Sequence, residues 1–289
     1  MTLAAALPGQ QFRLGGITGY TLGKKGAPLL LVHSVNAAAS AAEVRPVYEH
    51  FAATRRVIAY DMPGYGLSER ADIDYTPRLM TDALHAVVAE VQRRCDPKKP
   101  VDVLAVSLGC EFLARAAVER PGDYGRLAFV SPTGFNGSSP RRGAPGSTRE
   151  IGWLRSFLRV PWAPSLFRGL TRPGVVRYFL QRTWGGKQID ETLWAYCVAT
   201  AREPGARHAP LQFLSGCMFS GDIHDVYERV SQPAWASHGV RGDFTDYRQL
   251  GGLVAQRPNW TVDVFQTGAM PYFEMPDAFN TKLAAFLGD

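Results

Sequence analysis

The stretch Val101-Asp102-Val103-Leu104-Ala105-Val106-Ser107-Leu108-Gly109-Cys110 decides the fold. It joins a β-branched run of strand length to a helical pattern over residues 111–120. Small residues, Ala105 and Gly109, stand two positions before and two positions after Ser107. Small residues let a strand and a helix approach closely, and the tight turn between them pushes the serine hydroxyl outward. The pattern predicts a nucleophile elbow, although Ala replaces the more usual first Gly. An ordinary serine in a strand-to-helix loop is the alternative.

The composition is typical of a soluble globular enzyme. The chain has 289 residues, of which 46% are hydrophobic and 20% charged, which suits one large α/β domain with an insertion or two small domains. Four scattered cysteines lack metal-ligand spacing and predict reduced thiols, with neither a metal nor another cofactor. The first ten residues contain no basic residue, and no stretch is long enough to span a membrane. We therefore expect a cytoplasmic protein.

The positive charge is concentrated in one segment. Residues 137–230 hold 13 of the 32 Lys and Arg but 7 of the 26 Asp and Glu, so they carry the whole net charge of +6. A local excess of this kind argues against a nucleic-acid-binding protein, which needs a basic face on a recognised module. It favours an acidic ligand or a membrane surface near this segment, and a solvated basic face is the simplest explanation.

Strand and helix patterns alternate through most of the chain, which predicts a mostly parallel eight-stranded sheet with helices on both faces. The expected strands are an opening hairpin over 11–22 and the runs 28–33, 56–60, 101–106, 127–130, 233–238 and 260–265. The expected helices of this layer are 41–51, 75–93 and 277–287. The runs 28–33 and 56–60 are almost wholly apolar, as in strands buried on both faces.

A different pattern interrupts this alternation. Residues 131–147 are rich in Gly, Pro, Ser and Arg, and five apolar helical pieces follow over 151–218. We expect a core domain of residues 1–135 and 231–289 and a helical cap of residues 136–230. Cap aromatics, Trp162 among them, either line a pocket for an apolar or aromatic small molecule or pack the cap onto the core. An amphipathic helix that touches a membrane surface is a further alternative, because apolar and basic residues alternate between positions 154 and 162. These residues are Leu154, Phe157, Leu158 and Trp162, with Arg155 and Arg159.

Five features in this order resemble the α/β-hydrolase family. They are Leu31-Val32-His33-Ser34, Asp61-x-Pro63-Gly64-x-Gly66-x-Ser68, the elbow at Ser107, Gly239-x-x-x-Asp243, and Gly268-Ala269-Met270-Pro271-x-x-Glu274-x-Pro276. The resemblance covers the chain outside the cap. It implies an α/β-hydrolase sheet with the cap inserted after the sixth strand, and a serine hydrolase acting on an ester or other carbonyl substrate.

The resemblance assigns a role to each of several residues. Ser107 would be the nucleophile, and the N–H groups of Leu108 and Val35 would form the oxyanion hole. Asn36 could add a side-chain donor. We interpret His33 as a buried histidine that braces this loop.

The family's acid falls on Asp243, whose task would be to orient an imidazole. Asp246 is a nearby competitor for that role. The alternative for Asp243 is the N-cap of a helix beginning near Thr245.

The family's base is missing, because Ala269 stands where the histidine is expected and alanine cannot accept a proton. Four explanations remain open. The histidine was replaced deliberately, another residue serves as the base, the chemistry is not hydrolytic, or the protein only binds a ligand. His238, His208, His224 and Tyr272 are the candidates for a substitute base.

Overall fold

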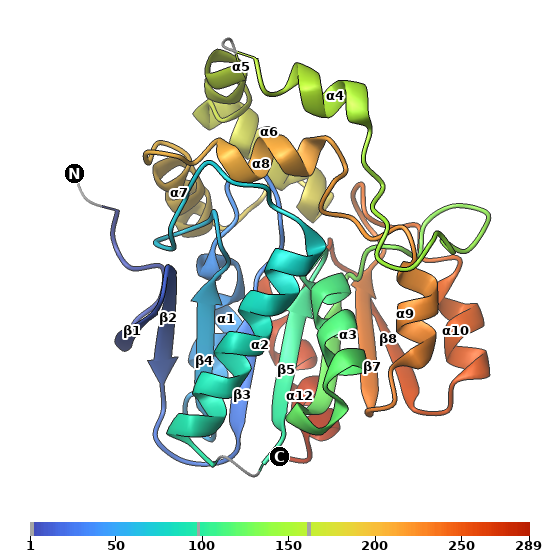
Figure 1. The fold of residues 1–289 in the computed structure, drawn as a ribbon. Helices are drawn as coiled ribbons and strands as arrows, with labels where there is room; N and C mark the ends of the chain where they lie inside the picture. The colour runs from blue at the N-terminus through green and yellow to red at the C-terminus, as the bar shows by residue number, and fades with distance from the viewer. Residues whose placement is uncertain (1–2, 97–98, 161–162) are drawn as a thin grey trace.

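The computed structural model describes residues 3–96, 99–160 and 163–289. Its centre is one eight-stranded sheet with the strand order β1-β2-β4-β3-β5-β6-β7-β8 (Figure 1). The strands are β1 Gln10–Leu14, β2 Ile17–Leu22, β3 Pro28–Val32, β4 Arg56–Asp61, β5 Val101–Val106, β6 Tyr124–Val130, β7 Ala234–Gly239 and β8 Trp260–Phe265. β2 pairs antiparallel with β1 and β4, and all other pairs are parallel, which confirms the predicted sheet.

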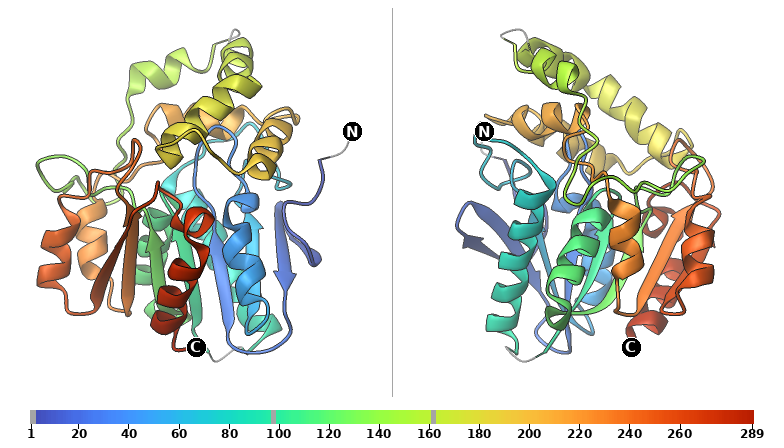
Figure 2. Two further views of the ribbon diagram at one scale, coloured as in Figure 1. Left: turned by 180° about the vertical axis from the view of Figure 1, so that it is seen from behind. Right: turned by 45° about the vertical axis from the view of Figure 1, so that its right-hand side comes forward.

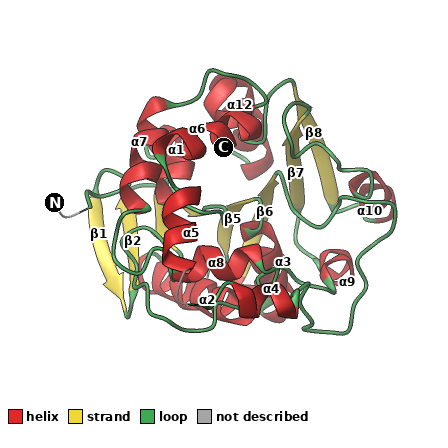
Figure 3. Ribbon diagram, turned by 90° about the horizontal axis from the view of Figure 1, so that it is seen from above, coloured by secondary structure: helices red, strands yellow, loops and turns green. Residues whose placement is uncertain are grey.

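Helices cover both faces of the sheet (Figure 3). On one face lie α2 (Pro77–Arg94), α3 (Gly109–Glu119), α9 (Ile223–Arg229) and α10 (Leu250–Gln256). On the other lie α1 (Arg45–Phe51), α12 (Pro276–Leu287) and the short α11 (Pro271–Glu274). Each face has its own hydrophobic core, because successive side chains of a strand point to opposite faces.

The cap helices lie above the carboxyl ends of the strands (Figure 2). They are α4 (Gly152–Phe157), α5 (Ala163–Leu170), α6 (Pro173–Trp184), α7 (Glu191–Thr200) and α8 (His208–Leu214). The two chain segments that lead into and out of the cap pair with each other, with a bridge between Thr148 and Ser220. The last helix of the expected cap segment, α9, packs against α3 of the core. The part of residues 136–230 that covers the strand ends therefore stops before α9.

The loop after β4 requires glycine at position 66. The buried carboxylate of Asp61 accepts hydrogen bonds from the N–H groups of Ala41 and Leu67 and from the hydroxyl of Tyr20. A Cβ on Gly66 would overlap this carboxylate, and Gly66 also has a positive φ of 50°. The motif around Asp61 thus fastens this loop to β2 and to the helical segment that begins at Ala41.

The residues described include no helix with the length and apolar character needed to cross a membrane.

Candidate active site

Ser107 lies at the carboxyl end of the central strand β5, in the turn that leads into α3. Its φ is +53°, and among the described residues other than glycine only Ser107 and Ser131 have a positive φ. A left-handed conformation costs a residue with a Cβ about 1–2 kcal/mol. The Ser107 N–H donates to the carbonyl of Val130 at 2.8 Å, which fixes the turn to β6. The strained, partly exposed serine has the local geometry that the sequence predicts.

The elbow is packed closely against the loop after β3. A Cβ on Gly109 would lie 2.7 Å from the carbonyl oxygen of His33, so this position has room only for glycine. Val35 and Leu108 are both buried. Within the described parts of the chain, neither of their N–H groups has a hydrogen-bond acceptor. One of these amides directly follows the serine, and the other belongs to the loop that packs against Gly109. An oxyanion needs free donors of this kind.

Asn36 does not fit the role of additional oxyanion donor. Its Nδ2 group donates to Glu43 Oε1 at 2.6 Å and to the hydroxyl of Ser34 at 3.0 Å. Its Oδ1 accepts the N–H of Ala38 at 2.8 Å. Both amide hydrogens are therefore used inside the loop, and we assign Asn36 to loop structure instead.

His33 has the contacts of a brace. Its Nε2 accepts the N–H of Met62 at 2.9 Å, so the ring hydrogen is on Nδ1, which donates to the carbonyl of Ser34 at 2.6 Å. The side chain is fully buried, and this burial lowers the pKa of His33 to about 4. His33 is thus a neutral ring that joins the loops after β3 and β4.

Asp243 faces a cap arginine. Its carboxylate accepts hydrogen bonds from Arg182 Nε and Nη2, both at 2.7 Å, and its N–H donates to the Arg182 carbonyl at 3.1 Å. The N-cap alternative is wrong, because the next helix begins at Leu250. Asp246, the competitor, accepts hydrogen bonds from the N–H of Gly137 and from Arg248.

Ala269, where the resemblance leads us to expect a histidine, also contacts the cap. The N–H of Ala269 donates to the Thr183 carbonyl at 2.9 Å, and its own carbonyl accepts the Ser131 hydroxyl at 2.7 Å. A Cβ on Gly268 would lie 2.5 Å from the Thr183 carbonyl oxygen. The carboxyl end of α6 therefore docks on both loops from which the family takes its acid and its base.

The candidate substitute histidines have other partners. His208 Nδ1 lies 3.1 Å from Asp72 Oδ1, and His224 Nδ1 accepts the N–H of Arg141 at 2.8 Å. The ring of His238 stacks on that of Tyr247, with 4.0 Å between centroids. Within the described parts of the chain, no hydrogen bond joins a histidine to the Ser107 hydroxyl.

Tyr272 is also unsuited to the role of base. Its side chain is fully buried, and burial raises its pKa well above the usual value for a tyrosine. A phenol that stays protonated at neutral pH can donate a hydrogen bond but cannot accept the serine proton.

Most of the cap aromatics do not line a pocket. Phe167 and Trp184 are buried in the packing of the cap, with the Trp184 ring 5.4 Å from that of Phe273. Others face outward, and Trp153 has 72% of its surface exposed. Trp162 lies outside the described residues.

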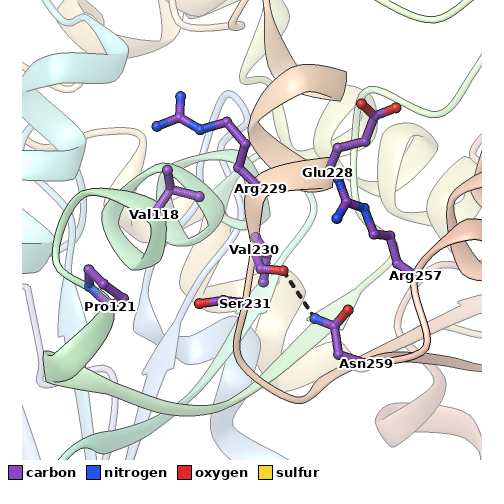
Figure 4. Close-up of a pocket in the computed structure, with 8 residues that line it drawn as sticks. All are labelled: Val118, Pro121, Glu228, Arg229, Val230, Ser231, Arg257 and Asn259. Carbon is purple, nitrogen blue, oxygen red and sulfur yellow. Dashed lines mark hydrogen bonds between the residues drawn. The ribbon is translucent and has the colours of Figure 1, made fainter.

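Ser107 does not line either of two hollows found in the structure. An open pocket of about 550 Å³ is found where the chain enters β7 and β8, at the opposite end of the sheet from the elbow (Figure 4). Its lining residues are Val118, Pro121, Glu228, Arg229, Val230, Ser231, Arg257 and Asn259. A second cavity of about 10 Å³, the space of one water molecule, separates residues 37–39 from the cap. The described residues contain no cluster of potential metal ligands.

The sequence reasoning missed two residues of this site, Glu43 and Arg182. The only signal for Glu43 was an acid among the small and apolar residues 38–44, where a carboxylate needs partners. Arg182 gave no signal, because basic residues occur throughout the cap.

Comparison with known proteins identifies the relatives of this chain. The model described as "Alpha/beta hydrolase family" matches residues 29–282. No curated protein sequence matches. A solved serine hydrolase involved in carbazole degradation superposes with a TM-score of 0.74 at 17% identity, covering 96% of this chain and 98% of the other. A 2-hydroxy-6-oxo-6-phenylhexa-2,4-dienoate hydrolase from Rhodococcus superposes with a TM-score of 0.73 at 16% sequence identity, covering 96% of this chain and 98% of the other. A meta-cleavage product hydrolase from Pseudomonas fluorescens superposes with a TM-score of 0.72 at 15% sequence identity, covering 97% of each chain.

Proposed function

The chain belongs to the α/β-hydrolase family, and from this premise we propose that it is a serine hydrolase of an ester or another small carbonyl compound, with Ser107 as its nucleophile. The observation that carries the proposal is the strained φ of +53° at Ser107, together with two buried residues, Leu108 and Val35, whose N–H groups have no acceptor among the described residues. Strain of this kind persists where the surrounding structure enforces it, and it is concentrated at functional sites.

The proposed chemistry is acyl transfer. The Ser107 oxygen forms a bond to the carbonyl carbon, and the N–H groups of Leu108 and Val35 stabilise the resulting oxyanion. The oxyanion then re-forms the carbonyl as the bond to the leaving group breaks, the leaving group takes up a proton, and water hydrolyses the acyl-serine. One such donor typically contributes about 3–4 kcal/mol in the transition state. The serine proton must pass to water or to the substrate, because Ala269 stands at the position of the base. We therefore expect turnover several orders of magnitude below that of a complete triad.

We propose an apolar or aromatic small molecule as the substrate. One of the similar structures is named as a serine hydrolase involved in carbazole degradation, and another as the hydrolase of a phenyl-bearing dienoate. Their names suggest the class to be screened first. We also propose a cytoplasmic location, which the four free cysteines support.

The test is covalent labelling with a fluorophosphonate, in which the serine oxygen displaces fluoride at phosphorus. We expect wild type to be labelled and Ser107→Ala to remain unlabelled. Ser131→Ala is the matched control, because Ser131 also has a positive φ and lies at the end of the neighbouring strand. Equal labelling of wild type and Ser107→Ala would remove Ser107 as the nucleophile.

One observation favours a second function, the binding of an apolar ligand without turnover. Asp243 is bound to Arg182, and Ala269 cannot relay a proton, so neither half of the usual acid–base pair is available. Saturable binding of an aryl ester, together with no labelling and no product, would establish this function in place of hydrolysis.

A further inference from the structure

Glu43 lies directly beneath the loop that carries Val35. It belongs to the short helix η1 (Ala41–Val44), and 3% of its surface is exposed. Its Oε2 accepts the N–H of Ser34 at 2.8 Å, and its Oε1 accepts the Asn36 Nδ2 group at 2.6 Å. One carboxylate therefore holds the residue before Val35 and the residue after it.

These bonds belong to a set that also engages the polar side chains of the loop. Asn36 also donates to the Ser34 hydroxyl and accepts the N–H of Ala38, so the loop is closed on itself. The Val35 N–H is left without an acceptor among the described residues, although Val35 is 4% exposed. A buried N–H without an acceptor costs free energy, so the loop must be held in place by other contacts.

We propose that Glu43 is a positioning residue for the oxyanion hole: its carboxylate fixes residues 34–36 so that the Val35 N–H stays free for the oxyanion formed at Ser107. This inference rests on the proposed function. The described residues provide no cation paired with Glu43, and burial raises the pKa of its carboxyl. A buried acid without a cation stabilises a fold poorly, which favours a role in the site over a role in stability.

A second buried acid, in the helix that follows the elbow, serves as a matched control for Glu43. Glu111, in the first turn of α3, is fully buried, and burial raises the pKa of its carboxyl. It accepts the Thr133 hydroxyl at 2.6 Å and the N–H of Ser220 at 2.8 Å, so it holds the entry and exit of the cap and not the Val35 loop. The two acids differ in the loop that they hold.

The experiment compares Glu43→Gln with Glu111→Gln. Glutamine keeps one acceptor oxygen but turns an N–H toward a donor, so one of the two loop contacts is lost. We expect labelling of Ser107 by the fluorophosphonate to be about tenfold to a hundredfold slower in Glu43→Gln, the scale of one weakened oxyanion donor. Glu111→Gln should stay within about threefold of wild type, since its acid does not touch the donor loop. With an aryl ester, kcat should fall and KM should stay unchanged.

Hydrogen exchange in the peptide covering residues 33–38 separates this inference from the proposed function. If wild type is labelled and both variants are labelled equally fast, the role of Glu43 is overturned and Ser107 remains the nucleophile. If wild type is not labelled, the proposed function fails, and faster exchange in Glu43→Gln than in Glu111→Gln then supports Glu43 as the residue that holds the loop. If the two variants exchange equally fast in that case, the role of Glu43 is overturned. Should Glu43→Gln not fold, Asn36→Ala removes the same bridge and must slow labelling in the same way.

Discussion

The guanidinium of Arg182 donates two parallel hydrogen bonds to the carboxylate of Asp243, Nε to Oδ2 and Nη2 to Oδ1, both 2.7 Å long. Paired bonds of this geometry are the most specific contacts that arginine makes with a carboxylate. They fasten the carboxyl end of α6 to the loop after β7. Asp243, to which the resemblance assigned the role of the acid, therefore contacts the cap in this structure.

This pairing predicts the result of introducing a histidine at position 269. An imidazole needs a carboxylate to orient it and to stabilise its charged form, and Arg182 occupies that carboxylate. We expect Ala269→His alone to change the turnover of an aryl ester by less than about threefold, and Ala269→His with Arg182→Gln to raise it by about tenfold or more. The measurement is the steady-state rate of all three proteins.

Arg177 provides the control for this experiment. It lies on the same helix and makes a two-bond ion pair with Glu191, away from the loop after β7. Ala269→His with Arg177→Gln should behave like Ala269→His alone. An equal gain from both arginine variants would mean that a loosened cap, and not a freed aspartate, is responsible.

The local features of the fold could be predicted from the sequence because each depends on neighbouring residues. The turn at Ser107, the alternation of strands and helices and the brace role of His33 all follow from short patterns. The docking of α6 on Asp243 could not be predicted, because 61 positions separate Arg182 from Asp243 and no periodic signal links them. Asp243 also looked like a helix N-cap, since the helical pattern that follows it does not show where the helix begins.

The strain at Ser107 predicts a difference in stability between two small substitutions. Ser107→Gly removes the Cβ that makes a φ of +53° unfavourable, whereas Ser107→Ala keeps it. We expect Ser107→Gly to be about 1 kcal/mol more stable than Ser107→Ala in urea unfolding. Ser156, inside α4, is the control. There Ser156→Gly should be less stable than Ser156→Ala, because glycine disfavours a helix. The same order at both positions would contradict strain at the elbow.

The contact of Gly109 with the loop after β3 predicts the effect of a single methyl group. In Gly109→Ala the new Cβ would lie 2.7 Å from the His33 carbonyl oxygen, so helix and loop must separate. We expect a loss of about 1–3 kcal/mol in stability and slower labelling of Ser107. Gly251 in α10 has no atom within 4 Å of an added Cβ, so Gly251→Ala should stabilise by up to about 1 kcal/mol. Thermal unfolding of both variants makes the comparison.

The loop after β3 shows where recognition of a motif is insufficient. The resemblance placed Val35, Asn36 and His33 in this loop, but the roles of the last two depend on their partners. Asn36 is held by Glu43, which comes from η1, and His33 is held by the N–H of Met62, which follows β4. Contacts between separate segments decide which polar groups stay free for a ligand.

The burial of His33 predicts a pH dependence of stability. Its pKa is about 4 in the folded protein and near 6.5 when the chain is unfolded. Between these values the unfolded chain binds the proton and the folded protein does not, so the free energy of unfolding falls as the pH is lowered from about 7 to 4. A shift of this size corresponds to roughly 3 kcal/mol. Wild type should lose about this much more stability than His33→Gln over the range, measured by urea unfolding at each pH.

The other buried groups, Glu43 and Asp61 among them, are common to both proteins and cancel in the difference. Parallel pH profiles would show that His33 is not held neutral by the contacts with Met62 and Ser34.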